Sequence, residues 1–132
     1  MTSLTLRATG RAPTDLAWRR YADTRLWSSW SPQIRRVELD AHTHELRDGL
    51  TGRVVGPIGV SVRFEVESVD EAAMTWVWRV HTGPVTMRLH HAVLSEGDGC
   101  TTTLTIEGPA LVAVSYSLPA QLALHRLVKV TP

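Results

Sequence analysis

The feature that most constrains this chain is a series of strand patterns from residue 33 to residue 108, separated only by short turns. In the clearest of them, residues 60–66, an apolar side chain occupies every second position. This alternation gives a strand one buried face and one face in water. Turns as tight as Gly97-Asp98-Gly99 join neighbouring strands in antiparallel order. The sequence therefore predicts an antiparallel sheet whose apolar face needs a cover.

The C-terminal segment, residues 109–130, can provide this cover. Its apolar residues recur at helical spacing, at Leu111, Val114, Leu118, Leu122 and Val128. A helix of this length would measure roughly 30 Å, enough to cross a small domain. We expect its sheet-facing side to carry Leu111, Ser115, Leu118 and Leu122. Pro119 predicts a kink or break, because proline removes a backbone donor and clashes with the preceding turn.

The N-terminal part adds one strand and two short helices. Alternation predicts a strand over residues 2–9, and Pro13 suits the first position of a helix that runs to about Asp23. A second helical turn carries Trp27 and Trp30 on one face. The order is then strand, two short helices, six strands and a long helix, which indicates an α+β fold. The length suits a single domain over residues 1–132, with no room for two cores.

Composition excludes several classes of protein. Charged residues make up 20% of the chain and the formal net charge is +1, with no basic run of the kind that binds nucleic acid. Cys100 is the only cysteine, so an internal disulfide is excluded and a reducing cytoplasm is the natural setting. We expect no signal peptide, and no membrane span because Ser115, Pro119 and Gln121 interrupt the C-terminal segment. The expected location is the cytoplasm.

Several short sequence motifs, taken in order, point to a known family. They are Arg11-Ala12-Pro13 with Trp18, the turn Trp27-Ser28-Ser29-Trp30-Ser31-Pro32, Trp76-x-Trp78, His90-His91 and Glu107-Gly108-Pro109. Together they resemble the polyketide cyclase/dehydrase branch of the START-like (SRPBCC, Bet v 1-like) superfamily. The resemblance covers nearly the whole chain. It implies a helix-grip fold, in which a curved seven-stranded sheet wraps the C-terminal helix around a deep cavity for hydrophobic small molecules.

If such a cavity forms, strand alternation predicts which side chains face it. They are Val62, Phe64, Trp76, Trp78, Met87, Leu89, His91, Thr102 and Leu104, with Leu118 and Leu122 from the helix. Tryptophan and methionine walls suit an apolar ligand, aromatic or polyketide-like. Trp27 and Trp30 either cap the entrance or anchor the short helix, and anchoring is favoured for Trp30. The alternative is that these large side chains fill the core and leave no cavity.

Two residues are the candidates for catalysis. His91 is the ionisable group on the inferred inner face of the later strands, and an imidazole can transfer the protons that enolisation and loss of water require. The alternative is a core histidine paired with a neighbour. A bulge in this strand would place His90 inside instead. Tyr116 either points its hydroxyl into the cavity or packs the helix.

No cofactor is predicted, and a metal site is not expected. His42 and His44 with Glu45 are the one arrangement worth checking, but the sequence places no third ligand beside them. The chain also lacks the esterase, phosphate-loop, zinc-protease and dinucleotide motifs. Edge strands leave a homodimer open, without identifying a pairing surface.

Three functions follow from the resemblance and the predicted face. The first is a cyclase or dehydratase of secondary metabolism, in which the cavity folds a polyketide-type substrate and His91, helped by Tyr116 or Thr102, moves protons. The second is a non-catalytic carrier or sensor of an apolar molecule. The third is a protein-interaction module of the chaperone-activator kind, working through the sheet surface.

Overall fold

The computed structural model describes residues 2–132. Seven strands form one antiparallel sheet in the order β1-β7-β6-β5-β4-β3-β2. The strands are β1 (Thr2–Gly10), β2 (Arg36–Leu39), β3 (Thr51–Val55), β4 (Ser61–Asp70), β5 (Thr75–Thr82), β6 (Val85–Glu96) and β7 (Gly99–Gly108). The helices are α1 (Thr14–Ala22), α2 (Trp27–Trp30) and α3 (Ala110–Leu127), with 3-10 turns η1 (Thr24–Leu26) and η2 (Pro57–Gly59). This confirms the predicted α+β order.

Short hairpins join β4 to β5, β5 to β6 and β6 to β7, as the turn signals predicted. Gly83 and Gly97 each have a φ of +57°, a conformation that glycine adopts at little cost. The register shifts once, between Val66 and Ser68 on β4, where a bulge interrupts the pairing with β5. The ladders on both sides of β6 run without a shift. His91 therefore faces the inside of the sheet, and His90 faces outward.

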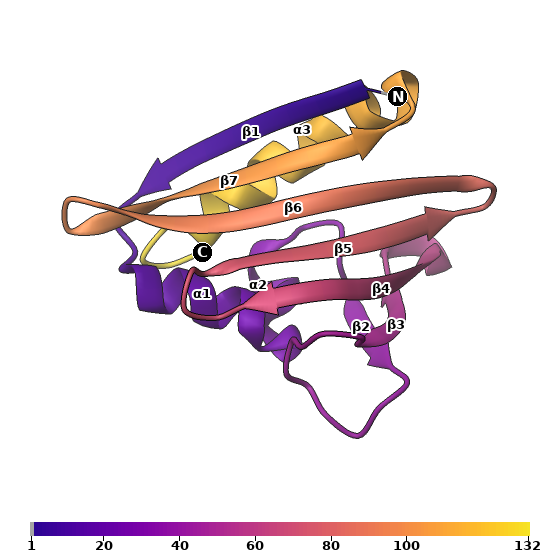
Figure 1. Cartoon of the computed structure of the whole chain (residues 1–132), viewed down its shortest axis with the longest axis horizontal. Helices are drawn as coiled ribbons and strands as arrows, with labels where there is room; N and C mark the ends of the chain where they lie inside the picture. Colours follow the sequence, from indigo (N-terminus) through magenta and orange to yellow (C-terminus); the bar gives the residue numbers. More distant parts are fainter. Residues whose placement is uncertain (1) are drawn as a thin grey trace.

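The long helix lies along one part of the curved sheet, and the short helices lie beside the rest. Figure 1 shows α3 behind β1 and β7. The short helices α1 and α2 lie at the lower left of the view, and α1 contacts β6. Between these elements sits one connected core that includes Trp27, Phe64, Trp76 and Leu104. The architecture is thus a sheet with helices on its concave face. The candidate site lies between the sheet and the helices.

The face of α3 that meets the sheet differs from the sequence prediction. Leu111 and Leu118 are 81% and 79% exposed, and Leu122 is also exposed. The buried side carries Ala113, Ala120, Ala123, Leu124 and Leu127. The helix is apolar on nearly every side, so spacing alone did not identify the buried one. Small alanine side chains allow the helix to approach the sheet closely, and the bulky leucines of the other side remain in solvent.

Pro119 does not break the helix, which continues from Ala110 to Leu127. Of the predicted kink or break, the break is therefore wrong. Pro119 withdraws the backbone donor of Ser115 O, and the nearby hydroxyls do not replace it, since Ser115 Oγ donates to Leu111 O at 2.8 Å and Ser117 Oγ donates to Val114 O at 2.6 Å. Packing of the alanine side against the sheet holds a helix that proline would weaken in isolation.

A buried arginine attaches α1 to the end of α3. Arg20 is only 5% exposed, and its guanidinium donates to three backbone carbonyls of the C-terminal segment. The acceptors are Leu127 O at 2.6 Å, Lys129 O at 2.5 Å and Val130 O at 2.9 Å. These carbonyls have no helical partner at a C-terminus, and a cation is favoured there. The arginine therefore fixes where α3 ends relative to α1.

Candidate ligand cavity

A cavity of about 450 Å³ lies between the sheet, α2 and α3. Its wall is built from the inner faces of β3 to β7, from α1 and α2, and from Tyr116, Ala120, Ala123 and Leu124 of α3. Small-molecule pockets usually measure about 300–1,000 Å³, so this volume suits a small ligand. The large aromatic side chains therefore do not fill the interior, and the alternative of a closed core is not what the structure shows.

The cavity opens toward the connection between β3 and β4. Ile58 and Val60 line it and are 94% and 55% exposed. Ile58 has a φ of +56°, which a β-branched residue rarely adopts. Backbone strain of this kind is concentrated at ligand clamps and switch regions of proteins. The connection is thus an apolar, strained rim at the opening.

Most of the predicted site residues lie in the cavity wall. They are Trp27, Trp30, Phe64, Trp76, Trp78, Met87, His91 and Tyr116. The period-two pattern of β4, β5 and β6 placed the strand residues Phe64, Trp76, Trp78, Met87 and His91 on the correct face, because successive side chains of a strand alternate between its faces. Their roles in binding or catalysis remain predictions.

Four predicted residues are not in the wall. Leu89 and Thr102 are buried on the inner side of the sheet, but they lie outside the cavity lining. Leu118 and Leu122 lie on the exposed side of α3, so their predicted place facing the sheet is wrong. The error follows from the misassigned face of α3, whose Ala120, Ala123 and Leu124 occupy the wall instead.

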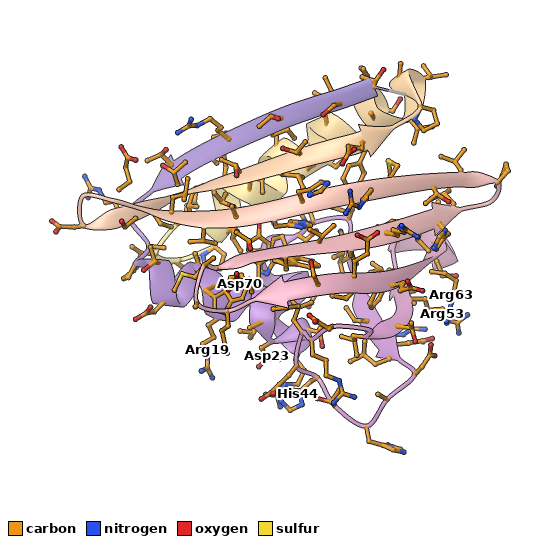
Figure 2. All side chains as sticks on the ribbon, viewed as in Figure 1. Arg19, Asp23, His44, Arg53, Arg63 and Asp70 are labelled. Carbon is orange, nitrogen blue, oxygen red and sulfur yellow. The ribbon has the colours of Figure 1, made fainter. Side chains whose placement is uncertain are left out.

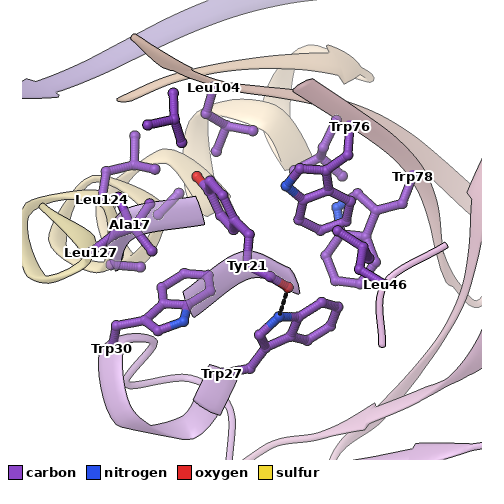
Figure 3. Close-up of a cluster of buried hydrophobic side chains, with 14 of the residues drawn as sticks. Ala17, Tyr21, Trp27, Trp30, Leu46, Trp76, Trp78, Leu104, Leu124 and Leu127 are labelled. Atoms are coloured by element: carbon purple, nitrogen blue, oxygen red, sulfur yellow. Dashed lines mark hydrogen bonds between the residues drawn. The ribbon is translucent and has the colours of Figure 1, made fainter. Parts of the chain in front are cut away.

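Tyr21 is the centre of the aromatic cluster that forms the inner end of the cavity. Figure 3 shows it between Trp30 of α2 and Trp76 of β5. Its ring makes edge contacts with both at a centroid distance of 5.4 Å, and with His91 at 5.3 Å. The sequence analysis did not identify Tyr21 as a cavity residue. The signal that could have found it is a tyrosine in the first predicted helix that could face the tryptophans of a predicted strand.

Trp27 and Trp30 both anchor the short helix, which was the role favoured for Trp30, and both also line the cavity wall. The indole N–H of Trp27 donates to Tyr21 O at 2.8 Å, as drawn in Figure 3. The indole N–H of Trp30 donates to Arg20 O at 3.0 Å. Both bonds tie α2 to the end of α1. The apolar faces of the rings remain available to the cavity.

His91 is held flat against Trp76. The two rings are 3.9 Å apart with an angle of 8° between their planes. His91 Nδ1 lies 3.4 Å from the carbonyl oxygen of Trp76, a long contact that suits a donated proton. Burial lowers the pKa of His91 to about 3, although the hydrogen bond to the Trp76 carbonyl opposes this shift. The imidazole is therefore neutral at physiological pH.

The two tyrosines of the wall are also neutral. Thr102 Oγ1 donates to Ala92 O at 3.0 Å, and the Tyr21 hydroxyl lies 3.1 Å from Thr102 Oγ1, which leaves the tyrosine as donor. Burial raises the pKa of Tyr21 far above its ordinary value. Burial also raises the pKa of Tyr116, although a hydrogen bond with the Gln33 side chain opposes this. The cavity wall therefore carries no charge at neutral pH from its tyrosines or its histidine.

The pair of histidines considered for metal lies elsewhere. Figure 2 shows His44 in the loop between β2 and β3, away from the sheet. His42 and His44 are both exposed, and the His44 carbonyl accepts bonds from Thr24 rather than orienting an imidazole. Across residues 2–132, no group of three His, Cys, Asp or Glu side chains is arranged to hold an ion.

Comparison with known proteins identifies the family. The profile of the family described as "Polyketide cyclase / dehydrase and lipid transport" matches residues 1–129. The chain belongs to this family. A search with this chain finds no significant match among curated protein sequences. Within residues 2–132, none of the helices has the length and apolar character needed to cross a bilayer.

Solved structures agree with this family assignment at the level of fold. Ara h 8.0201 superposes with a TM-score of 0.75 at 12% identity, covering 96% of this chain and 94% of that one. XoxI from Bacillus cereus gives 0.76 at 14% identity, covering 97% and 94%. A protein from Thermobifida fusca gives 0.74 at 18% identity, covering 94% and 85%. The helix-grip fold of the START-like (SRPBCC, Bet v 1-like) superfamily is thereby confirmed.

Proposed function

We propose that this member of the polyketide cyclase/dehydrase and lipid transport family binds a hydrophobic small molecule in its cavity and acts as a carrier or sensor of it. The observation that carries the proposal is the character of the wall. The described residues that line the cavity include no Asp, Glu, Lys or Arg, and most are aromatic or aliphatic. Burial of apolar ligand surface against such a wall is favourable by about 25 cal/mol per Å².

The state of His91 favours binding over acid–base catalysis. One face of the imidazole is covered by Trp76 at 3.9 Å, and Tyr21 contacts its edge. With a pKa of about 3 the ring is a weak base, and near neutral pH it lacks the second proton that an imidazolium would give as an acid. Efficient general acids and bases have pKa values near the working pH. A carrier or sensor needs no such group.

Cyclisation or dehydration of a polyketide-type substrate is the second candidate. The observation in its favour is that His91 and Tyr116 both line the same cavity. Confinement of a flexible chain in the folded conformation would accelerate ring closure through orientation alone. On this reading the His91→Phe variant loses turnover of such a substrate while it still binds the molecule.

The test of the proposal is to block the cavity and measure binding. Val62 lines the cavity from β4, and Val62→Trp places a large side chain in that space. We expect the variant to bind a neutral fluorescent probe such as Prodan at least about tenfold more weakly, because the apolar contact area is lost. The matched control is Leu118→Trp on the exposed side of α3, which should bind as the wild type does.

Equal affinities of wild type and Val62→Trp, with unchanged circular dichroism, would contradict a cavity site. Native mass spectrometry of the wild-type protein from its own host then identifies any co-purifying molecule. A molecule recovered in cyclised form from wild type and in open form from His91→Phe would favour the second candidate.

A further inference from the structure

The side of α3 that faces away from the sheet exposes a row of large apolar side chains, which we call the outer stripe. It consists of Leu111, Val114, Leu118 and Leu122, which are 81%, 55%, 79% and 47% exposed in the single chain. These residues recur at spacings of three and four, so they share one side of the helix. A contiguous apolar patch on a soluble protein usually marks an interaction site. The outer stripe is therefore a candidate interface.

The polar side chains beside the outer stripe already have hydrogen-bond partners within the chain. Ser115 Oγ and Ser117 Oγ donate at 2.8 Å and 2.6 Å to backbone carbonyls of the preceding turn of α3. The side-chain amide of Gln121 donates to Arg7 O of β1 at 2.8 Å. Burial is costly for a polar group when it leaves that group without a partner. A second surface could thus cover this side of α3 without stranding these side chains.

The charge pattern indicates which kind of surface fits the outer stripe. No Asp, Glu, Lys or Arg occurs from residue 110 to residue 124. Helices that lie on lipid surfaces carry Lys and Arg beside their apolar face, and an interface for a charged partner carries the opposite charge. The outer stripe has neither. An identical stripe on a second copy matches it, because neither copy would bury an unpaired charge.

Two copies of the outer stripe are also large enough for a specific contact. Together, the four side chains of both copies expose on the order of 1,000 Å² of apolar surface, which is about what a specific interface needs. The formal net charge is +1 per chain, so long-range repulsion between two copies is weak. A two-fold axis through this surface places the same residues on both sides, and the assembly then closes at two copies.

We propose that the protein forms a two-fold dimer through the outer stripe of α3, with Leu118 close to the axis. The contact uses the side of α3 opposite the one that lines the cavity, so each copy keeps its own cavity. An interface of this size is weak, and we expect a Kd on the order of 10 µM. The outer stripe lies outside the core of the chain, so the monomer folds alone, and denaturation well below this concentration reports the monomer.

Sedimentation velocity of the full chain, from about 1 µM to about 200 µM, tests the proposal because this range brackets the expected Kd. We expect the average mass to rise from 14.6 kDa toward twice that value. Leu118→Glu places two carboxylates near each other in an apolar contact and should raise the Kd at least about 100-fold. Leu111→Glu, at the end of the stripe, should raise it at least about tenfold. Glutamate is a good helix former, and circular dichroism verifies that both variants are folded.

The matched control is Leu94→Glu. Leu94 lies on β6, outside the outer stripe, and is 49% exposed. The substitution adds the same charge to an exposed leucine, so it separates a local effect at α3 from a general effect of net charge. We expect this variant to dimerise with the Kd of the wild type.

Three results would overturn the proposal. The first is a wild-type chain that keeps the mass of one copy at about 200 µM; flotation of that monomer with phosphatidylcholine vesicles, lost in Leu118→Glu, would then assign the stripe to a lipid surface. The second is a dimer that both Leu118→Glu and Leu111→Glu leave intact, which would point to the edge strands β1 and β2 instead. The third is a mass that continues to rise beyond two copies, since an isologous contact closes.

Discussion

At the scale of single residues, His91 shows what alternation along a strand does and does not determine. The pattern of β6 placed it on the inner face, and the structure confirms that facing. Its protonation depends on Trp76 from β5 and Tyr21 from α1, which are distant in sequence. A strand pattern carries no information about such neighbours. The side chain was therefore located correctly, whereas its neutral state was not foreseen.

The depressed pKa of His91 predicts how stability depends on pH. Between an ordinary value of 6.5 and about 3, the unfolded chain binds a proton at this residue that the folded chain does not. The contribution of His91 to the free energy of unfolding is thus fully present above pH 6.5. It falls as the pH drops, by up to about 1.4 kcal/mol per pH unit. We expect His91→Phe to reduce the loss of stability between pH 7 and pH 5 by about 2 kcal/mol in urea denaturation.

The control for this prediction is His42→Phe, which alters an exposed imidazole. It should keep the pH dependence of the wild type. If His91→Phe lost stability toward pH 5 as steeply as the wild type, the buried imidazole would not be the cause.

At the scale of elements, α3 separates what sequence predicts from what packing decides. Its existence, length and position after Pro109 followed from composition and periodicity. Its buried face did not, because apolar residues surround the helix and either side satisfied the spacing. The choice is made by closeness of approach, since Ala113, Ala120 and Ala123 fit where leucines would not. Residue size, not hydrophobicity, was the informative signal.

The orientation of α3 predicts a large difference between two leucines. Leu124 is 2% exposed, so Leu124→Ala should lower the free energy of unfolding by about 2–5 kcal/mol through lost burial and a residual cavity. Leu118 is 79% exposed, so Leu118→Ala should change it by less than about 0.5 kcal/mol. Urea denaturation of both variants measures this. Similar losses at the two positions would mean that α3 is rotated about its axis.

At the scale of the whole molecule, the sequence predicted the fold better than the site. Seven strands, two short helices and a final long helix followed from alternation and turn signals. The family resemblance implied a cavity, but its volume of about 450 Å³ could not be predicted, because it depends on how far α2 and α3 lie from the sheet. The homodimer that edge strands left open in the sequence remains untested.

Arg20 joins parts of the molecule that are far apart in sequence, and its loss should affect the whole fold. Arg20→Met leaves three carbonyls at the end of α3 without their donor. We expect the free energy of unfolding to fall by about 3–5 kcal/mol, measured by urea denaturation. Arg19→Met, at the exposed neighbouring position of α1, should change it little. Equal effects of the two substitutions would show that the bonds of Arg20 contribute no special stability.

The pairing of β1 with β7 has a consequence for how the chain is made. Thr2 lies opposite Gly108 and Gly10 lies opposite Cys100, so β1 pairs along its whole length with β7, although β2 to β6 lie between them in the chain. Closing loops of this length slows folding, and strands without partners expose edges that can pair with other chains. β1 therefore has no partner until β7 has been synthesised, and only then is one of its two edges protected.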